Sequence, residues 1–315
     1  MHNMSARSWI ALTLLVALAL PAWAAAEIQA EEYVYADGEN ALKGYIACDD
    51  DSDEKRPGVV IFPEWWGVND YVKMRARQLA SLGYVALVAD VYGGGKATED
   101  PEQAARWAQL YKGDAKRFRQ RARLALEALE EHDRVDDDKL AAIGYCFGGT
   151  AALELARSGA DVQIVVSFHG GLGTTRPAER GDIQAMVLVC HGAADPHVSE
   201  KEVQAFQKEM AASGADWQMN TYGSAVHSFT NPDAGDDASD GVAYHATAAA
   251  RAWADMKTRL RETIGLPNPD AKDGGGGIGR FAKEKIVDPA VKAGKVTGKA
   301  AKKAGQWIAE KVTGN

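Results

Sequence analysis

The chain has 315 residues, 46% of them hydrophobic, which is enough apolar material for one large core. Its formal net charge of -8 argues against a general nucleic-acid binder. The charge is unevenly distributed, because residues 271–315 hold ten basic and four acidic residues, whereas residues 1–270 hold 26 basic and 40 acidic ones.

The first 26 residues have the pattern of a secretory signal peptide. Arg7 supplies a positive charge, Trp9–Leu20 form an apolar run, and small residues follow it. Cleavage after Ala24 or after Ala26 fits this pattern equally well. The run is shorter than the roughly 20 residues that span a bilayer, although an uncleaved anchor is the competing interpretation. We therefore expect export, with a bacterial periplasm as the destination.

Short apolar runs then alternate with amphipathic stretches. A hairpin is expected over Tyr33–Ala47, with its turn at Asp37–Asn40. Buried strands are expected over residues 59–62, 85–89, 140–143, 164–168, 186–189 and 217–222. Helices are expected over residues 72–82, 101–111, 115–131, 150–157, 199–212 and 241–264. The alternation predicts an α/β fold, doubly wound, with a mainly parallel sheet and helices on both faces. Functional sites of such folds collect at the carboxyl ends of the strands.

The last segment breaks this pattern. Residues 267–315 begin with a Gly-rich linker and continue as a basic, low-complexity tail. The expected organisation is therefore a signal peptide over 1–26, an α/β domain over 27–266 and this tail. The tail is either a flexible, partly helical extension or a basic amphipathic segment that contacts an anionic membrane surface or an envelope partner.

The three cysteines are too few for a disulfide scaffold in a chain of this length. In an oxidising compartment, their odd number is compatible with one pair and a free thiol, or with three free thiols. If a pair forms, Cys48 with Cys190 is the pairing that leaves Cys146 free.

Cys146 lies in the segment Gly144-Tyr145-Cys146-Phe147-Gly148 between a predicted strand and a predicted helix. This spacing is typical of a nucleophile elbow, a tight turn that lifts one side chain above the sheet. Glycines are needed where a Cβ would collide with neighbouring backbone. The helix N-terminus favours a thiolate. A buried structural cysteine on a Gly-rich connection is the alternative.

A thiol nucleophile needs a base, and the base needs an acid that orients it. In hydrolases of this architecture the chain order is nucleophile, acid and then histidine. Asp195 follows the predicted strand over 186–189, and His227 follows the strand over 217–222. This order selects Asp195 and His227 as the partners of Cys146. His197 lies beside the acid and is a candidate for the lining of the pocket.

The loop after the strand over 59–62 supplies two further candidates. Glu64 is expected beside Cys146, where its carboxylate would hold the thiol protonated until substrate displaces it; an exposed loop acid is the ordinary alternative. The backbone N–H of Trp65 is placed to join that of Phe147 as an oxyanion hole.

These residues resemble the dienelactone hydrolase family. The shared motifs are P-E-W-W-G-V-N (63–69), A-D-V-Y (89–92), G-Y-C-F-G-G (144–149), H-G-A-A-D-P-H-V (191–198) and V-H-S-F (226–229), in the order of the family. The resemblance covers roughly Tyr33–Leu266 and implies an α/β-hydrolase fold. It implies Cys146, His227, Asp195 and Glu64 as catalytic residues. It also implies hydrolysis of lactones or esters through an acyl-enzyme, with no metal or organic cofactor.

The chain departs from the family in the residues expected to contact substrate. Members that act on dienelactone bind its carboxylate through two arginines. One lies four residues after the catalytic histidine, where this chain has Asn231, and Arg106 is the nearest candidate for the other. Tyr92 and Phe229, from two shared motifs, are further candidates. Because Trp65 and Trp66 would make the pocket bulky and apolar, we expect a neutral ester or lactone.

The leading prediction is thus an exported hydrolase of small-molecule esters or lactones. A catalytically idle adaptor of the cell envelope is a second interpretation, supported by the tail and by the missing arginine. An idle domain, however, has no need to retain a complete triad. A thioesterase on the same triad is a third interpretation, which only substrate screening separates from the first.

Overall fold

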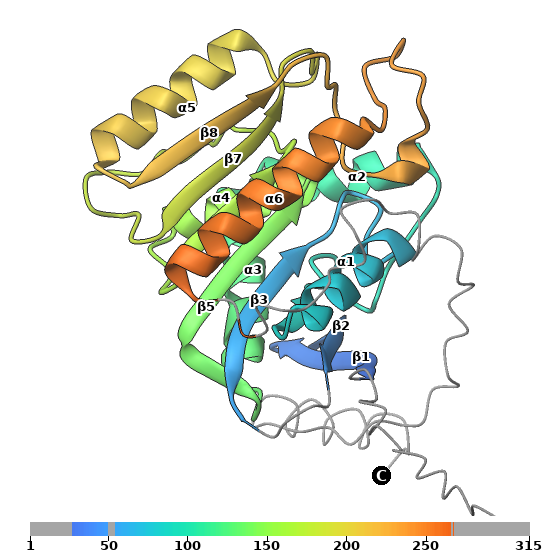
Figure 1. Cartoon of the computed structure of the whole chain (residues 1–315), viewed down its shortest axis with the longest axis vertical. Helices are drawn as coiled ribbons and strands as arrows, with labels where there is room; N and C mark the ends of the chain where they lie inside the picture. Colours follow the sequence, from blue (N-terminus) through green and yellow to red (C-terminus); the bar gives the residue numbers. More distant parts are fainter. Residues whose placement is uncertain (1–26, 50–53, 266, 268–315) are drawn as a thin grey trace, which may run out of the picture.

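The computed structural model describes residues 27–49, 54–265 and 267. The predicted signal peptide and basic tail lie outside these residues. The described chain forms one sheet with helices packed on both faces, which confirms the predicted fold class (Figure 1). Among the described residues, no helix combines the length and the apolar character needed to cross a membrane.

The sheet has eight strands in the spatial order β1-β2-β4-β3-β5-β6-β7-β8. Only β1 with β2 and β2 with β4 pair antiparallel, and the other neighbours are parallel. The strands are β1 (Ile28–Asp37), β2 (Asn40–Asp49), β3 (Arg56–Phe62), β4 (Val85–Val88), β5 (Val135–Tyr145), β6 (Ile164–Phe168), β7 (Met186–Gly192) and β8 (Trp217–Tyr222). The hairpin β1–β2 turns between Asp37 and Asn40, as predicted.

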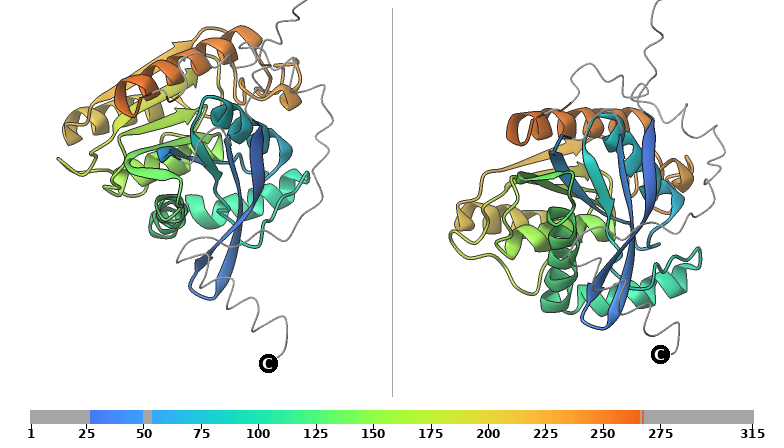
Figure 2. Two further views of the ribbon diagram at one scale, coloured as in Figure 1. Left: turned by 60° about the horizontal axis from the view of Figure 1, so that its bottom comes forward. Right: turned by 90° about the horizontal axis from the view of Figure 1, so that it is seen from below.

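Six α-helices cover the sheet within the described residues. They are α1 (Asp70–Ser81), α2 (Pro101–Lys112), α3 (Ala115–Glu130), α4 (Phe147–Arg157), α5 (Glu200–Ser213) and α6 (Ala246–Thr263). Helices α1 and α6 pack on one face, and α2 to α5 pack on the other, so the core has two apolar layers (Figure 2). Five of these helices begin after a side chain that accepts a backbone N–H of the first turn: Asn69, Asp100, Asp114, Ser199 and His245.

Two helix starts differ from the sequence-based expectation by three residues or more. The helix α4 begins at Phe147, directly after Cys146 and three residues before the expected start. The last helix begins at Ala246 rather than 241, because Gly241 adopts φ +84° and the side chain of His245 caps the helix by accepting the N–H of Ala248. The residues before it form a long loop that returns to the cleft.

All three cysteines are free thiols. Cys48 lies on β2 and Cys190 on β7, which are five strand positions apart in the sheet. At about 4.8 Å per position the separation is on the order of 24 Å, far beyond the reach of a disulfide. The pairing of Cys48 with Cys190, which the sequence left open, is therefore excluded.

The order of the strands reverses beside β3. The chain continues from β3 to β4 on one side and then returns to β5 on the other side of β3. Phe62 and Gly144 pair at the carboxyl ends of β3 and β5, so the loops with Glu64 and Cys146 leave the sheet side by side. Ligands of doubly wound sheets bind at such a switch point.

Candidate active site

Cys146 lies at the apex of a strained turn between β5 and α4. Its φ of 53° and ψ of -116° are unfavourable for a residue with a side chain, a strain on the order of 1–3 kcal/mol. A Cβ at Gly144 would collide with the backbone of Gly148, and a Cβ at Gly148 would collide with the backbone of Phe62 and Pro63. Both glycines of the motif are therefore required by close backbone contacts, as an elbow demands.

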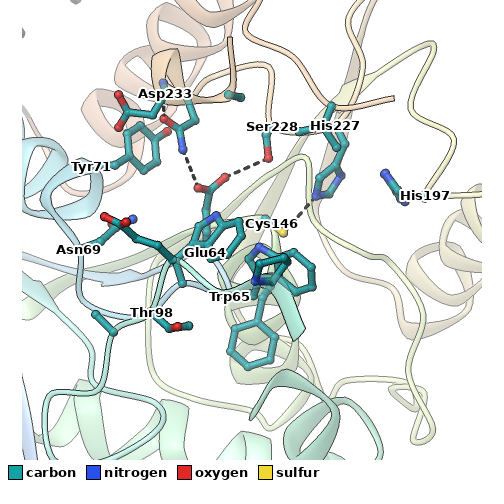
Figure 3. A pocket seen from close by; sticks show the side chains of 18 of the residues that line it. Glu64, Trp65, Asn69, Tyr71, Thr98, Cys146, His197, His227, Ser228 and Asp233 are labelled. Atoms are coloured by element: carbon teal, nitrogen blue, oxygen red, sulfur yellow. Dashed lines mark hydrogen bonds between the residues drawn. The ribbon is translucent and has the colours of Figure 1, made fainter. Parts of the chain in front are cut away.

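The structure brings Cys146, His227 and Asp195 into one hydrogen-bonded chain. His227 Nε2 lies 3.0 Å from Cys146 Sγ, and His227 Nδ1 lies 2.9 Å from Asp195 Oδ2. Asp195 also accepts the backbone N–H of His197 through Oδ1, at 2.8 Å. Figure 3 shows the side chains of Cys146 and His227 directed at each other, joined by their hydrogen bond. The three residues come from the ends of β5, β7 and β8, as the sequence predicted.

The electrostatic surroundings favour the charged forms of His227 and Asp195. Burial opposes the charge on His227, but the negative charge of Cys146 and the hydrogen bond to Asp195 raise the pKa of His227 to about 10. Burial also disfavours ionised Asp195, but its hydrogen bond with His227 holds the pKa of Asp195 below its usual range. The arrangement can therefore hold an imidazolium at His227 at neutral pH, between the sulfur of Cys146 and the carboxylate of Asp195.

Glu64 is buried in the same cleft, but its carboxylate is not directed at the thiol. Ser228 Oγ donates to Glu64 Oε1 at 3.1 Å, and Asn231 Nδ2 donates to Oε2 at 2.7 Å (Figure 3). Burial raises the pKa of Glu64, against the opposing effect of these two hydrogen bonds. The expected contact with Cys146 is therefore replaced by contacts with the loop that carries His227.

The two N–H groups expected to form an oxyanion hole belong to adjacent turns. Within the described residues, neither Trp65 N–H nor Phe147 N–H has a hydrogen-bond acceptor. Gly148 lets the first turn of α4 touch the backbone of Phe62 and Pro63 at the end of β3, just before the turn that carries Trp65. Both residues line the cleft that Cys146 faces, so both donors are available to an oxygen bound there.

The cleft has a volume of about 1240 Å³ and contains three of the residues expected to contact substrate: Trp66, His197 and Asn231. The ring of His197 packs edge-on against His227, with centroids 5.1 Å apart. Trp66 packs against Trp65 at 5.0 Å in a similar geometry. Asn231 is occupied by Glu64 and caps the short 3-10 helix Pro232–Ala234.

Three other residues expected to contact substrate do not line the cleft. Tyr92 lies beneath it, with its ring stacked on Phe147 and its hydroxyl donating to Trp65 O at 3.0 Å. Phe229 is fully buried in the apolar layer under α6. Arg106 is on the solvent side of α2, where it contacts Glu102 and Gln103. The structure thus places these three residues outside the lining of the cleft, because motif membership does not reveal which side chains face inwards.

The loop after β8 has a second role that the sequence patterns did not indicate. Ser228, Thr230 and Asn231 each hold a buried group of the site, and Ser228 does so with φ +56°. A run of small polar residues directly after the presumed base was the only signal for them. Among the described residues, no group of three or more His, Cys, Asp or Glu side chains is arranged to hold a metal ion.

The dienelactone hydrolase family model matches residues 42–264 of this chain. A solved dienelactone hydrolase-like promiscuous phosphotriesterase from metagenomic libraries is 45% identical, with a TM-score of 0.71, over 76% of this chain and 99% of its own. The solved structure named m3DLH is 43% identical, with a TM-score of 0.72, over 75% of this chain and 99% of its own.

Curated proteins show the same relationship at lower identity. A Yersinia pestis protein, whose name assigns it provisionally as a carboxymethylenebutenolidase, is 24% identical to this chain. The alignment covers 68% of this chain and 81% of that protein. The match to the family model extends from within β2 to the end of α6 and includes Cys146, Asp195 and His227.

Proposed function

The chain belongs to the dienelactone hydrolase family, and on that premise we propose that it hydrolyses neutral esters and lactones through a thioester formed on Cys146. Membership of the family makes it a lactone or ester hydrolase. The observation that carries the finer proposal is the continuous hydrogen-bonded chain from Cys146 through His227 to Asp195.

In the first half of the reaction, the Cys146 thiolate attacks the carbonyl carbon of the substrate. The carbonyl oxygen becomes an oxyanion that accepts the N–H groups of Trp65 and Phe147. When this intermediate collapses, the carbon–oxygen bond to the leaving group breaks and His227 Nε2 gives its proton to the leaving oxygen. The products are a free alcohol, or the ring-opened alcohol of a lactone, and a thioester on Cys146.

In the second half, neutral His227 takes a proton from water and the resulting hydroxide attacks the thioester. The second oxyanion collapses, the carbon–sulfur bond breaks and a carboxylic acid leaves. Cys146 returns as a thiolate beside the imidazolium of His227. Asp195 keeps the ring oriented throughout and balances its positive charge.

The charges around the cleft support a neutral substrate. Lys112 is the single lysine or arginine among the described residues that line it, and four exposed acids line it as well: Asp70, Glu99, Asp233 and Asp240. Arg75 is buried and donates to the carbonyl of Thr230, and Arg106 lies outside the cleft. A substrate carboxylate would meet repulsion here instead of a pair of guanidinium groups.

The role of Cys146 is tested with p-nitrophenyl acetate and a panel of lactones. We expect Cys146→Ala to lose at least about 10³-fold in kcat, because both halves of the reaction need the thiol. Cys48→Ala is the matched control, since Cys48 lies on β2 away from the cleft, and it should keep wild-type rates. Activity retained by Cys146→Ala would refute the assignment.

The preference for neutral substrates is tested with two esters of similar size, p-nitrophenyl butyrate and the mono-p-nitrophenyl ester of succinic acid. At low salt, kcat/KM should be about tenfold or more lower for the anionic ester, and the gap should narrow as salt screens the acids. Asp233→Asn should raise the rate for the anionic ester only. Equal rates for the two esters would rule out this preference.

A second candidate activity is hydrolysis of neutral phosphate triesters. It is favoured by the 45% identity to the structure described as a promiscuous phosphotriesterase. Such a substrate has no charge to meet the acidic cleft, and its phosphoryl oxygen would occupy the same N–H pair. Release of p-nitrophenol from diethyl p-nitrophenyl phosphate by wild type, but not by Cys146→Ala, is the expected result.

We further propose that the protein is exported and that its basic tail binds anionic lipid. The signal-like pattern over 1–26 and the excess of basic residues over 271–315 support these two steps. N-terminal sequencing of the secreted or periplasmic protein should find cleavage after Ala24 or Ala26. Vesicles containing anionic lipid should bind the full chain more tightly than a chain ending at Asp270; equal binding would exclude the lipid contact.

A further inference from the structure

His169 is a strained and buried residue beneath the cleft that the proposed reaction does not use. Among the described residues, only four non-glycine residues have a left-handed φ: Cys146, His169, Ser224 and Ser228. Cys146 and Ser228 belong to the site. His169 has φ +41° and no exposed surface, and two glycines follow it. Strain of this kind persists at functional positions where the surrounding structure enforces it.

The ring of His169 bridges the turn that carries Cys146 and the loop that follows His227. Its Nδ1 shares the backbone N–H of Cys146, at 3.2 Å, with the carbonyl oxygen of Phe168, at 3.0 Å, and its Nε2 lies 2.7 Å from Thr230 Oγ1. The same ring packs edge-on against His227, with centroids 5.4 Å apart, and against Phe229 at 5.3 Å. One side chain therefore touches the turn of the nucleophile and the loop of the base.

The hydrogen bonds define the protonation state of this ring. Because Nδ1 accepts from Cys146, the neutral ring carries its proton on Nε2 and donates it to Thr230 Oγ1. Burial holds the pKa of His169 well below its usual range, and the charges on His227 and Arg75 lower it further. A neutral ring beneath His227 adds no repulsion to the imidazolium that the reaction forms.

The far end of the bridge is itself anchored. Thr230 Oγ1 lies 2.8 Å from Tyr71 Oη, and Arg75 Nη2 donates to the carbonyl of Thr230 at 2.8 Å. Tyr71 and Arg75 are one turn apart on α1, and both are buried. The loop of the base is thus tied to a helix on one side and to His169 on the other.

We infer that His169 is a positioning residue, which keeps the turn of Cys146 and the loop of His227 in register. The inference rests on the proposed roles of Cys146 and His227. If the backbone only required a left-handed conformation, glycine would adopt it without strain. A histidine here instead supplies an acceptor and a donor about two bonds apart on a rigid ring, which match the two groups that it joins.

The bridge is tested from both ends with conservative variants. His169→Phe keeps the ring and removes both hydrogen bonds, whereas Thr230→Val removes the hydroxyl and keeps the carbonyl that Arg75 binds. Each should lower kcat for p-nitrophenyl acetate by about tenfold to a hundredfold, the range expected for small misplacements, with KM changed less than about threefold. The double variant should lose no more than the larger single loss, since both changes remove one bridge.

Two comparisons separate positioning from packing. His169→Asn keeps an acceptor near Nδ1 and should recover part of the kcat that His169→Phe loses. Alkylation of Cys146 by iodoacetamide should slow at pH 7 in His169→Phe and approach the wild-type rate at alkaline pH, because the thiolate–imidazolium pair is weakened. A purely structural role predicts a lower melting temperature with unchanged kcat and an unchanged alkylation profile.

The control is Thr263→Val on α6, which removes a half-buried hydroxyl that donates to Arg259 O, and it should keep wild-type kcat. If His169→Phe does not fold, the kcat of Thr230→Val alone tests the inference. Wild-type kcat in folded Thr230→Val and His169→Phe would overturn the inference and leave the proposed function standing. Activity retained by Cys146→Ala would overturn the proposed function instead.

Discussion

Glu64 and Asp195 are buried carboxylates of the site that follow different strands, with 2% and 6% of their surface exposed. Asp195 follows β7 and bonds to His227, which can carry a positive charge. Glu64 follows β3 and accepts hydrogen bonds from two neutral groups, Ser228 and Asn231. The pKa of Asp195 is lowered, whereas burial raises the pKa of Glu64.

The difference shows that the partner, and not the degree of burial, decides the charge of a buried acid. A cation that donates a hydrogen bond compensates the desolvation of Asp195, but neutral donors compensate that of Glu64 only in part. The hydrogen bond with His227 therefore keeps the carboxylate of Asp195 ionised. The Glu64 side holds a carboxyl group that keeps its proton to a higher pH than an ordinary glutamate does.

The largest effect is expected on the Asp195 side. Asp195→Asn removes the charge and the hydrogen bond that raise the pKa of His227, so the imidazolium becomes less stable. We expect kcat to fall by about 10²–10⁴-fold, the usual contribution of an oriented acid–base group. The alkaline limb of the pH–rate profile should move to lower pH, which is measured from the initial rates of p-nitrophenyl acetate hydrolysis.

Asp161→Asn makes the same chemical change at an exposed position after α4 and should leave the profile unaltered. An Asp195→Asn enzyme with an unshifted alkaline limb would mean that the charge of Asp195 does not act on His227.

The second effect concerns stability on the Glu64 side. Because the folded pKa of Glu64 is raised, the folded state holds the proton more tightly than the unfolded chain does. The resulting stability is complete below the ordinary pKa of glutamate and is lost as the pH rises through the folded pKa. Glu64→Gln cannot ionise, so its melting temperature should rise relative to wild type between pH 4 and pH 8, by about 2–4 °C per kcal/mol.

The measurement is the difference in melting temperature between variant and wild type across that range, so that a constant cost of the amide cancels. Glu102→Gln, an exposed carboxylate on α2, should show a difference that does not change with pH. A flat difference for Glu64→Gln as well would show that its pKa is the same in the folded and unfolded chains.

Local patterns explain why much of the fold and part of the site were predictable. The strands and helices follow from short apolar runs and amphipathic stretches, and the glycines around Cys146 follow from contacts between neighbouring turns. The placement of Asp195 and His227 beside Cys146 follows from the chain order, because parallel strands bring their carboxyl ends to one edge. Each of these inferences needs only the sequence near one residue and the topology.

The remaining features depend on contacts between distant residues. His169 and Thr230 are 61 positions apart, and Glu64 and Asn231 are 167 apart, so no local pattern encodes either pair. The side of α2 on which Arg106 lies is decided by where the helix packs against α3. A motif could place these residues near the cleft, but only the packing shows which of them enter it.

The smallest effect is expected from the hydroxyl of Tyr92, which lies beneath the cleft and donates to the residue after Glu64. Tyr92→Phe keeps the ring stacked on Phe147 and removes the donor to the carbonyl of Trp65. The loss of one such bond costs about 1 kcal/mol of stability. Because the same turn carries the N–H of Trp65, we expect kcat to fall by about two- to fivefold as well, a fraction of the loss when an oxyanion donor is removed outright.

Tyr84→Phe separates the two consequences. Tyr84 is also buried and donates to a backbone carbonyl, that of Gly265 at 2.7 Å, but it directly precedes β4 and does not line the cleft. Both variants should lower the melting temperature by a similar amount, whereas only Tyr92→Phe should lower kcat. If the two variants behaved alike in both measurements, the position of the Trp65 turn would not depend on Tyr92, and the oxyanion site would be held by the elbow alone.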